Sequence, residues 1–269
     1  MAWRSSGTSN TELVENLWRN GLITQPLVKT AFLAVDRAHY APSSPYEDSP
    51  QAIGHAATIS APHMHANAVE SLLPFLLPKT ASGPQSAVGV ASVEGQGGRP
   101  RRVLDIGSGS GYLTHVLAEL VGEEGVVVGL EHIRELKELG ERNMGKSPEG
   151  RRLLESGRAR FRFGDGRKGW SEPRPTAAQP GVGGPAGEAE LKEEEGGWDA
   201  IHVGAAAVTL HEELISQLRS PGRMFIPVQD GDGWDQYIWT VDKDENGVVK
   251  KQKLYGVRYV PLTDAPTRA

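Results

Sequence analysis

The chain of 269 residues contains no cysteine. This excludes disulfide bonds, thiolate catalysis and metal sites with cysteine ligands. No apolar run approaches the roughly 18 residues needed to cross a bilayer, and the opening residues MAWRSSGTSNTEL lack the apolar core of a signal peptide. A formal net charge of -5 gives no reason to expect nucleic acid as a partner. We therefore expect a cytoplasmic, monomeric protein that binds neither nucleic acid nor membrane.

Two stretches contain too few large apolar residues to build a core. Residues 80–100 are small, glycine-rich and aperiodic, and residues 171–197 hold six Gly, four Pro and six Glu. Such composition is typical of segments without a packed fold of their own. We interpret both as flexible surface insertions in one domain that spans residues 1–269. A binding role for the acidic second insertion is the alternative.

A strand, a glycine turn and a helix follow one another in the segment RVLDIGSGSGYLTHVLAEL, residues 102–120. The apolar run that ends at Ile106 is typical of a buried parallel strand. Gly107, Gly109 and Gly111 follow, and glycine lets the backbone turn tightly and approach a ligand closely. Apolar residues then recur at helical spacing. This order is typical of a nucleotide-binding βα unit.

An acidic residue lies at or near the end of each of three predicted strands: Asp105, Glu131 and Asp165. The carboxyl ends of parallel strands form the ligand edge of such a sheet, where Glu131 would accept hydrogen bonds from ribose hydroxyls and Asp165 would face an adenine. The third small residue of the dinucleotide fingerprint is replaced by Tyr112, which disfavours a nicotinamide-dependent dehydrogenase. The combination predicts S-adenosyl-L-methionine as the ligand, although each acid alone could instead cap the following helix.

The predicted elements are N-terminal helices, then alternating strands and helices, then an antiparallel pair. Helices are expected after Ser9 and over 25–35, 62–77, 113–120, 133–144 and 210–218, with a turn at 153–157. Strands are expected over 103–106, 125–131, 160–163, 198–203, 223–228, 236–241 and 248–260. Residues 39–54 are expected to be loop, and Pro221-Gly222 a turn. This layout is typical of a class I S-adenosylmethionine-dependent methyltransferase. Its fold class is α/β: a Rossmann-like three-layer sandwich with a mostly parallel sheet, a C-terminal antiparallel hairpin and an added N-terminal helical layer.

Ser60 stands where the N-cap of the helix 62–77 belongs. The same hydroxyl could also face an anionic ligand at a helix N-terminus, and the two roles are compatible. His63 and His65 are two residues apart, so they do not share a helix face. With no further ligand residues beside them, we expect no metal site.

The end of the fourth strand carries the sequence GAAA from Gly204 onward, with no carboxylate, histidine or lysine. A nucleophile that must lose a proton near neutral pH would need a general base there. A carboxylate, with a pKa of about 4, needs none. The sequence therefore favours carboxyl O-methylation, in which catalysis consists of aligning the oxygen with the methyl group and removing water.

Motifs from most of the chain outside the two insertions resemble the protein-L-isoaspartate (D-aspartate) O-methyltransferase family. They are MAWRS, DRAHYAP, PYEDSPQAIG, ATISAPHMHA, LDIGSGSGYLT, GDGR, DAIHVGAAA and GVRYVPLTD. ATISAPHMHA and VPLTD are specific to the family. The resemblance implies transfer of a methyl group to the α-carboxylate of L-isoaspartyl and D-aspartyl residues in damaged proteins and peptides. The ester closes to a succinimide that can reopen to aspartate, which amounts to protein repair.

The resemblance also implies roles for individual residues. Ser60 is the active-site serine, which positions the substrate carboxylate. The cofactor is S-adenosyl-L-methionine, and its product is S-adenosyl-L-homocysteine. The residues implied to bind it are Thr58, Ile59, Ser60 and His65, which line the site; Asp105, Gly107, Gly109 and Ser110 at the methionine end; Glu131 and His132 at the ribose; Asp165 and Gly166 at the adenine; and Thr263, which closes over the site.

Two departures from the family pattern bear on the site. Glu131 replaces the aspartate of animal members, a longer acid that should still reach the ribose hydroxyls. The sequence ends soon after VPLTDAPTRA, so we expect any family contacts made further toward the C-terminus to be missing.

Two alternatives from different classes compete with the repair enzyme. A methyltransferase acting on another nucleophile would not distinguish an isoaspartyl peptide from its normal aspartyl isomer. A non-catalytic module that keeps the fold would bind the cofactor and form no methyl ester on any isoaspartyl peptide.

Overall fold

The computed structural model describes residues 5–78, 99–172, 196–231 and 235–262. The predicted insertions at 80–100 and 171–197 lie almost wholly outside these ranges, and so does Thr263; the expectations for them stay predictions. Within the described ranges, no helix is long and apolar enough to span a membrane.

A seven-stranded sheet forms the centre of the molecule, in the order β5-β4-β3-β6-β7-β8-β9. Its strands are β3 (Arg102–Ile106), β4 (Val126–Glu131), β5 (Ala159–Phe163), β6 (Trp198–Val203), β7 (Leu218–Gln229), β8 (Gln236–Lys243) and β9 (Val249–Val257). The first five run parallel, and β8 and β9 form an antiparallel hairpin at the edge. The predicted mostly parallel sheet with a C-terminal hairpin is confirmed.

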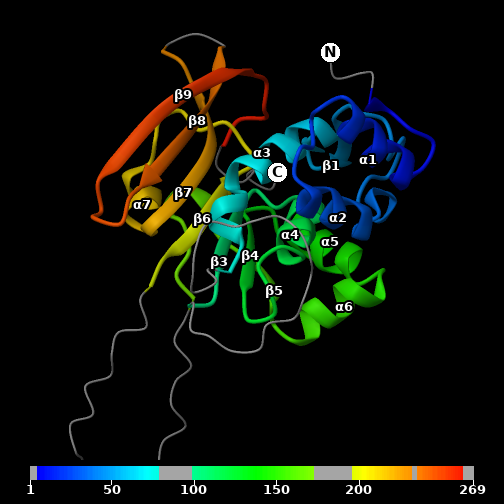
Figure 1. The fold of residues 1–269 in the computed structure, drawn as a ribbon, viewed down its shortest axis with the longest axis horizontal. Coiled ribbons are helices and arrows are strands. Elements are labelled where there is room, and N and C mark those ends of the chain that lie inside the picture. Colours follow the sequence, from blue (N-terminus) through cyan, green and yellow to red (C-terminus); the bar gives the residue numbers. More distant parts are fainter. Residues whose placement is uncertain (1–4, 79–98, 173–195, 232–234, 263–269) are drawn as a thin grey trace, which may run out of the picture.

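Helices cover the two faces of this sheet unequally. They are α1 (Asn10–Arg19), α2 (Pro26–Ala34), α3 (Pro62–Leu76), α4 (Tyr112–Ala118), α5 (Arg134–Met144), α6 (Pro148–Glu155) and α7 (Glu212–Ser216). Strand side chains alternate between faces: Val103 and Val127 join the core formed with α1–α5, whereas Leu104 and Val128 join the core on the side of α7. Figure 1 shows α1 and α2 on the opposite side of the molecule from β8 and β9, with α3 between them.

The N-terminal helices begin and end at the residues that their sequences favour. The Ser9 hydroxyl caps α1 by accepting a hydrogen bond from the Glu12 N–H at 3.2 Å. Gly21, at a φ of 70°, follows the end of this helix. Helix α2 begins at Pro26, which has no N–H to leave unsatisfied in the first turn. The predicted helical layer before the first βα unit is therefore confirmed.

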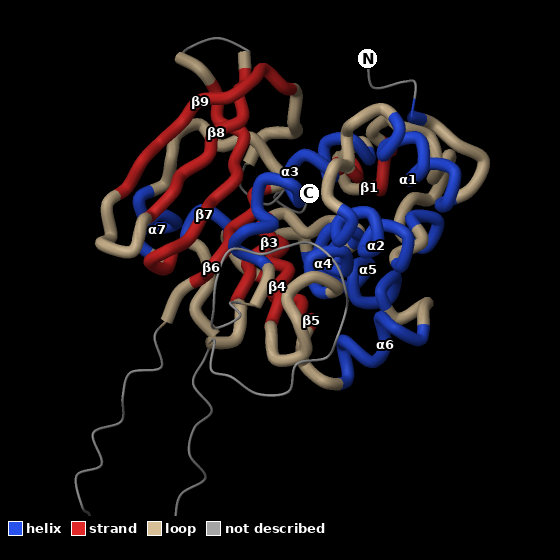
Figure 2. Tube along the Cα trace, in the orientation of Figure 1, coloured by secondary structure: helices blue, strands red, loops and turns tan. Residues whose placement is uncertain are grey.

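The expectation of a loop over residues 39–54 was wrong in its last part. Residues Gln51–Gly54 form β1, which pairs antiparallel with β2 (Ala57–Ile59) in a separate two-stranded sheet. Figure 2 shows this small sheet among the N-terminal helices. Strands of four and three residues are too short to show a periodic pattern. The turn between them uses His55 and Ala56 at positive φ, without the Asn-Gly that marks such turns in a sequence.

Two predictions near the fourth and fifth parallel strands were also wrong. The helix expected over 210–218 is only Glu212–Ser216, because β7 already begins at Leu218. Pro221 and Gly222 do not form a turn before the fifth strand, because they lie inside β7. There the register shifts between the pairs Trp198–Leu218 and Ala200–Arg223, so the two residues sit in an irregularity of the ladder. A bulge is one of the few places where a sheet accommodates proline.

Candidate functional site

The carboxyl ends of the parallel strands meet at one edge of the sheet. Ile106 pairs with both Leu130 and Val203, and Glu131 pairs with Phe163, so β3, β4, β5 and β6 end at one level. A cleft lies at this edge. Its lining residues are Thr58, Ile59, Ser60, His65, Asp105, Gly107, Ser108, Gly109, Ser110, Tyr112, Leu113, His202 and Gly204.

Packing and ligand approach both require glycine in the turn after β3. Gly109 and Gly111 adopt positive φ values of 51° and 86°. A Cβ atom on Gly111 would lie 2.9 Å from the Cζ of Phe161 and 3.0 Å from the Cα of Gly140. Only glycine at position 111 therefore lets the loop pass between β5 and α5. Gly107 and Gly109 of this turn line the cleft, and the close approach of their backbone to a ligand stays a prediction.

Asp105 is buried in the cleft wall and is held by two side chains of the protein. One carboxylate oxygen accepts a hydrogen bond from the Thr114 hydroxyl at 2.6 Å, and the other lies 2.8 Å from His202 Nδ1. Asp105 is only 1% exposed. The carboxylate can still accept further bonds, because its oxygens have four acceptor positions.

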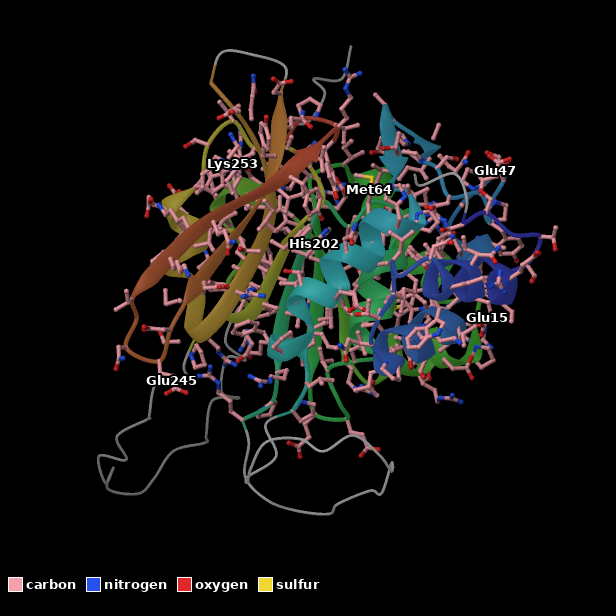
Figure 3. The ribbon with its side chains drawn as sticks, turned by 45° about the horizontal axis from the view of Figure 1, so that its top comes forward. Glu15, Glu47, Met64, His202, Glu245 and Lys253 are labelled. Carbon is pink, nitrogen blue, oxygen red and sulfur yellow. The ribbon has the colours of Figure 1, made fainter. Side chains whose placement is uncertain are left out.

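His202 is a cleft residue that the sequence did not reveal. The expectation that the fourth strand places no histidine beside the site considered only the residues after Val203. His202 lies within β6, in the centre of the molecule, and its ring stacks on Phe225 (Figure 3). The register of β3 against β6, which the sequence alone does not give, makes Asp105 and His202 direct partners that share a face.

Glu131 bonds to the backbone around it and does not line the cleft. One carboxylate oxygen accepts from the Gly109 N–H at 3.0 Å. The other accepts from the N–H groups of His132 at 2.8 Å and Ile133 at 3.1 Å. Of the four acceptor positions of a carboxylate, three are taken, and one is left for a ligand hydroxyl. The contact with Gly109 joins Glu131 to the glycine turn.

The predicted adenine-side residues also lie at the strand edge but outside the cleft. Asp165 accepts hydrogen bonds from the backbone N–H and the guanidinium of Arg167, at 2.8 to 3.0 Å. The side-chain hydrogen bond from Arg167 lowers the pKa of Asp165 below its usual 3.8. Gly166 packs against the side chain of Ile106 with no room for a Cβ.

Ser60 is not the N-cap of α3, so that prediction was wrong. The cap is Ala61, which offers no side-chain hydrogen bond. Ser60 follows directly on β2 and is partly buried, and its hydroxyl makes no hydrogen bond within the described ranges. The hydroxyl is thus available to a ligand in the cleft.

The first turn of α3 has no free backbone donor for an anion. Pro62 has no N–H group, and the His63 N–H donates to Asp48 at 3.0 Å. The N–H groups of Met64 and His65 both bond to the Ala61 carbonyl. The helix start beside Ser60 therefore offers a ligand no backbone donor from these residues.

The cleft brings together eight of the predicted site residues. They are Thr58, Ile59, Ser60, His65, Asp105, Gly107, Gly109 and Ser110. Glu131, His132, Asp165 and Gly166 lie at the same sheet edge without lining the cleft. Ser108, which was not predicted, also lines the cleft, and its buried hydroxyl has no protein partner among the described residues, which is unusual for a buried polar group. In the described part of the chain, no cluster of three or more histidines or acids could hold a metal ion.

Comparison with known proteins gives one consistent result. The family model described as Protein-L-isoaspartate(D-aspartate) O-methyltransferase matches residues 8–82, 96–182 and 187–267. The chain is 40% identical over 263 residues to the Caenorhabditis elegans protein-L-isoaspartate O-methyltransferase, covering 98% of this chain and 96% of that one. It is 39% identical over 261 residues to the Arabidopsis thaliana protein-L-isoaspartate O-methyltransferase 1, covering 96% and 93%.

A solved structure matches the fold over nearly the same span. It is a putative protein-L-isoaspartate O-methyltransferase from Plasmodium falciparum in complex with S-adenosyl-L-homocysteine. The TM-score is 0.72 at 29% identity, and the match covers 96% of this chain and 99% of the other.

Proposed function

The chain belongs to the protein-L-isoaspartate (D-aspartate) O-methyltransferase family, and on this premise we propose that the cleft beside Ser60 is where an isoaspartyl carboxylate meets the methyl donor. The protein is an S-adenosylmethionine-dependent methyltransferase that acts on isoaspartyl residues of damaged proteins and so begins their repair. Within this reaction, the residues of the sheet edge bind the donor, and those of the β2–α3 segment meet the acceptor.

The residues at the strand ends fit the methyl donor, S-adenosyl-L-methionine, by the chemistry of their donors and acceptors. Asp105 offers a buried carboxylate to the ammonium of the methionine end. Ser108 offers a hydroxyl that has no protein partner among the described residues. Glu131 keeps one acceptor position for a ribose hydroxyl, and the turn at Gly107 and Gly109 lets the ligand approach the backbone.

The reaction needs alignment and removal of water more than it needs a base. S-adenosyl-L-methionine, when bound, would supply a methyl group on a positively charged sulfur; a substrate carboxylate oxygen would bond to that methyl carbon while the electrons of the carbon–sulfur bond stay on sulfur, which leaves a neutral ester and a thioether. The Ser60 hydroxyl donates a hydrogen bond to the acceptor carboxylate and thereby orients that carboxylate. Ile59 and Leu113 line the cleft with apolar surface that displaces water.

The observation that carries this assignment is the Ser60 hydroxyl, which lines the cleft and is not used by the helix beside it. We expect Ser60→Ala to lower kcat about 10- to 100-fold, because the loss of one hydrogen bond to a charged group costs ~1.5–3 kcal/mol. The dissociation constant of S-adenosyl-L-homocysteine should change less than about threefold, that is by under about 0.7 kcal/mol.

The assay is transfer of labelled methyl groups to a peptide with one L-isoaspartyl residue, with its L-aspartyl isomer as control. Ser216→Ala, which removes an exposed hydroxyl on α7, is the matched variant and should behave as the unsubstituted protein. Equal losses of turnover and of ligand affinity in Ser60→Ala would contradict the role of Ser60. Label on neither peptide would contradict the proposed cleft chemistry as a whole.

We propose further that the protein is one domain that acts as a monomer in the cytoplasm. Seven of the described strands form one continuous sheet, and the N-terminal helices share a core with it, which supports a single domain. Sedimentation of the purified chain and localisation of a tagged copy would test the oligomeric state and the compartment.

A further inference from the structure

A completely buried arginine lies directly behind the cleft. Arg37 belongs to the short 3-10 helix Arg37–His39 and has 0% exposed surface. A buried guanidinium is costly unless something in its surroundings compensates for the lost water. Within the described ranges no carboxylate lies within 4 Å of it, and its Nε has no hydrogen-bond partner. The buried carboxylate of Asp48 favours the charge from beyond ion-pair distance, but burial outweighs it, so the fold compensates the cost only in part.

The contacts of Arg37 lead to the residues that line the cleft. One terminal nitrogen donates to the Ser60 carbonyl at 2.8 Å. The other lies 3.5 Å from Nδ1 of His65, and the guanidinium stands over the Tyr112 ring at 5.1 Å. All three partners line the cleft. Arg37 therefore fixes the part of the cleft wall that carries the Ser60 hydroxyl.

Other sources of positive charge on this side of the cleft are absent or occupied among the described residues. The first-turn N–H groups of α3 are bonded to Asp48 and to Ala61. Burial and the nearby Arg37 hold the pKa of His65 well below 6.5, so its ring is neutral at physiological pH. Burial lowers the pKa of Arg37 only to about 10, so the guanidinium stays protonated.

We propose that Arg37 is the positioning and charge-selecting residue of this site: it orients Ser60 and makes the cleft prefer a carboxylate to a neutral group. The inference rests on the proposed function. Methyl transfer turns the carboxylate into a neutral ester, so a fixed charge behind Ser60 attracts the substrate and has no such attraction for the product. The charge thus favours entry of the carboxylate and release of the ester.

The test compares binding of two peptides in the presence of S-adenosyl-L-homocysteine, which prevents turnover. One peptide carries an L-isoaspartyl residue, and its twin carries a carboxamide in place of the acceptor carboxylate. A charge within roughly 10 Å, at an effective dielectric constant of about 20, is worth on the order of tenfold in affinity. We expect the unsubstituted protein to prefer the carboxylate by about tenfold or more, and Arg37→Met to bind the two peptides within about twofold of each other.

Two further variants separate charge from packing. Arg37→Lys keeps the charge but loses the two terminal nitrogens that contact Ser60 and His65 separately. It should therefore keep most of the preference for the carboxylate while kcat falls, because Ser60 is less well oriented. Arg158→Met is the matched control: Arg158 donates to the Gly122 carbonyl at 2.6 Å, away from the cleft, and its loss should leave the preference intact. If Arg37→Met does not fold, the test is the preference of Arg37→Lys for the carboxylate peptide over the carboxamide peptide, which should be retained.

Each outcome has a definite meaning. A folded Arg37→Met that still prefers the carboxylate as strongly as the unsubstituted protein overturns the proposal, and so does an Arg37→Lys variant that loses the preference. Failure of the unsubstituted protein to methylate the isoaspartyl peptide would instead contradict the proposed cleft chemistry. The two failures are therefore distinguishable.

Discussion

Glu131 gives the sharpest test of how the ligand edge works, because it bonds both the glycine turn and the start of α5. Glu131→Ala removes the acceptor of three backbone N–H groups, those of Gly109, His132 and Ile133. Glu131→Gln keeps a carbonyl oxygen for two of them but turns an amide NH₂ toward the third. The two substitutions therefore separate the loss of charge from the loss of backbone support.

The expected magnitudes depend on these bonds and on burial. A hydrogen bond to a charged group contributes ~1.5–3 kcal/mol, but three bonds to one carboxylate are not additive. Glu131 is 4% exposed, so water can replace the lost bonds only in part. We expect Glu131→Ala to lower the free energy of unfolding by ~2–4 kcal/mol and Glu131→Gln by ~1–2 kcal/mol. Both should weaken binding of S-adenosyl-L-homocysteine about 10- to 100-fold, since neither offers a charged acceptor to the ribose.

Urea unfolding measures the first quantity, and calorimetric titration with S-adenosyl-L-homocysteine measures the second. Glu138→Ala on α5 is the control, because Glu138 is half exposed and its ion pair with Arg142 is 3.8 Å long. It should change neither quantity by more than ~0.5 kcal/mol. A folded Glu131→Ala protein with an unchanged dissociation constant would remove Glu131 from the ligand site. Unchanged stability would show that its backbone bonds contribute nothing to the fold.

Two further predictions concern stability. His65 has a pKa well below 6.5 in the folded state, owing first to burial and then to Arg37, so the unfolded chain binds its proton more readily. The free energy of unfolding should therefore fall as the pH drops below about 6.5, by up to ~1.4 kcal/mol per pH unit. Urea unfolding at several pH values should show a smaller dependence on pH for His65→Asn. An unchanged dependence would contradict the buried neutral ring. Gly111→Ala adds a Cβ 2.9 Å from Phe161, whereas Gly247→Ala, at a similar φ of 80°, meets no atom closer than 3.8 Å. Both variants place alanine in a left-handed conformation, but only Gly111→Ala adds a cost of ~1–3 kcal/mol from overpacking. Equal decreases in the free energy of unfolding of the two variants, measured by thermal unfolding, would refute the packing argument.

The fold was predictable where a long pattern repeats, and it was not where pairing between distant segments decides. The strand 198–203 was predicted at the bounds that the structure shows, and the strands 103–106 and 125–131 within one residue of theirs, because buried parallel strands are continuous apolar runs. The hairpin of β1 and β2 was missed, since three or four residues contain no readable period. The turn predicted at Pro221 was wrong for a related reason. A proline favours a turn on local grounds, whereas here the irregular register of β7 against β6 accommodates the proline within the strand.

The candidate site was predictable as a set of residues but not as a network. The strand ends placed Asp105, Glu131 and Asp165 at one edge, as the structure shows. No local pattern points to His202 or Arg37, because their contacts with Asp105 and Ser60 join segments that lie 97 and 23 residues apart. Side-chain partnerships across such separations depend on the packed fold, which a single sequence does not display.

The three acids also explain why the sequence left capping and ligand binding as open alternatives. Asp165 accepts from the Arg167 N–H at the start of a 3-10 helix, and Glu131 accepts from two N–H groups at the start of α5. Asp105 is held by two side chains. Each acid therefore already has donors from its own chain, and a ligand adds bonds at the acceptor positions that remain. Preorganised carboxylates of this kind lose little side-chain freedom on binding, so capping prepares the site for its ligand.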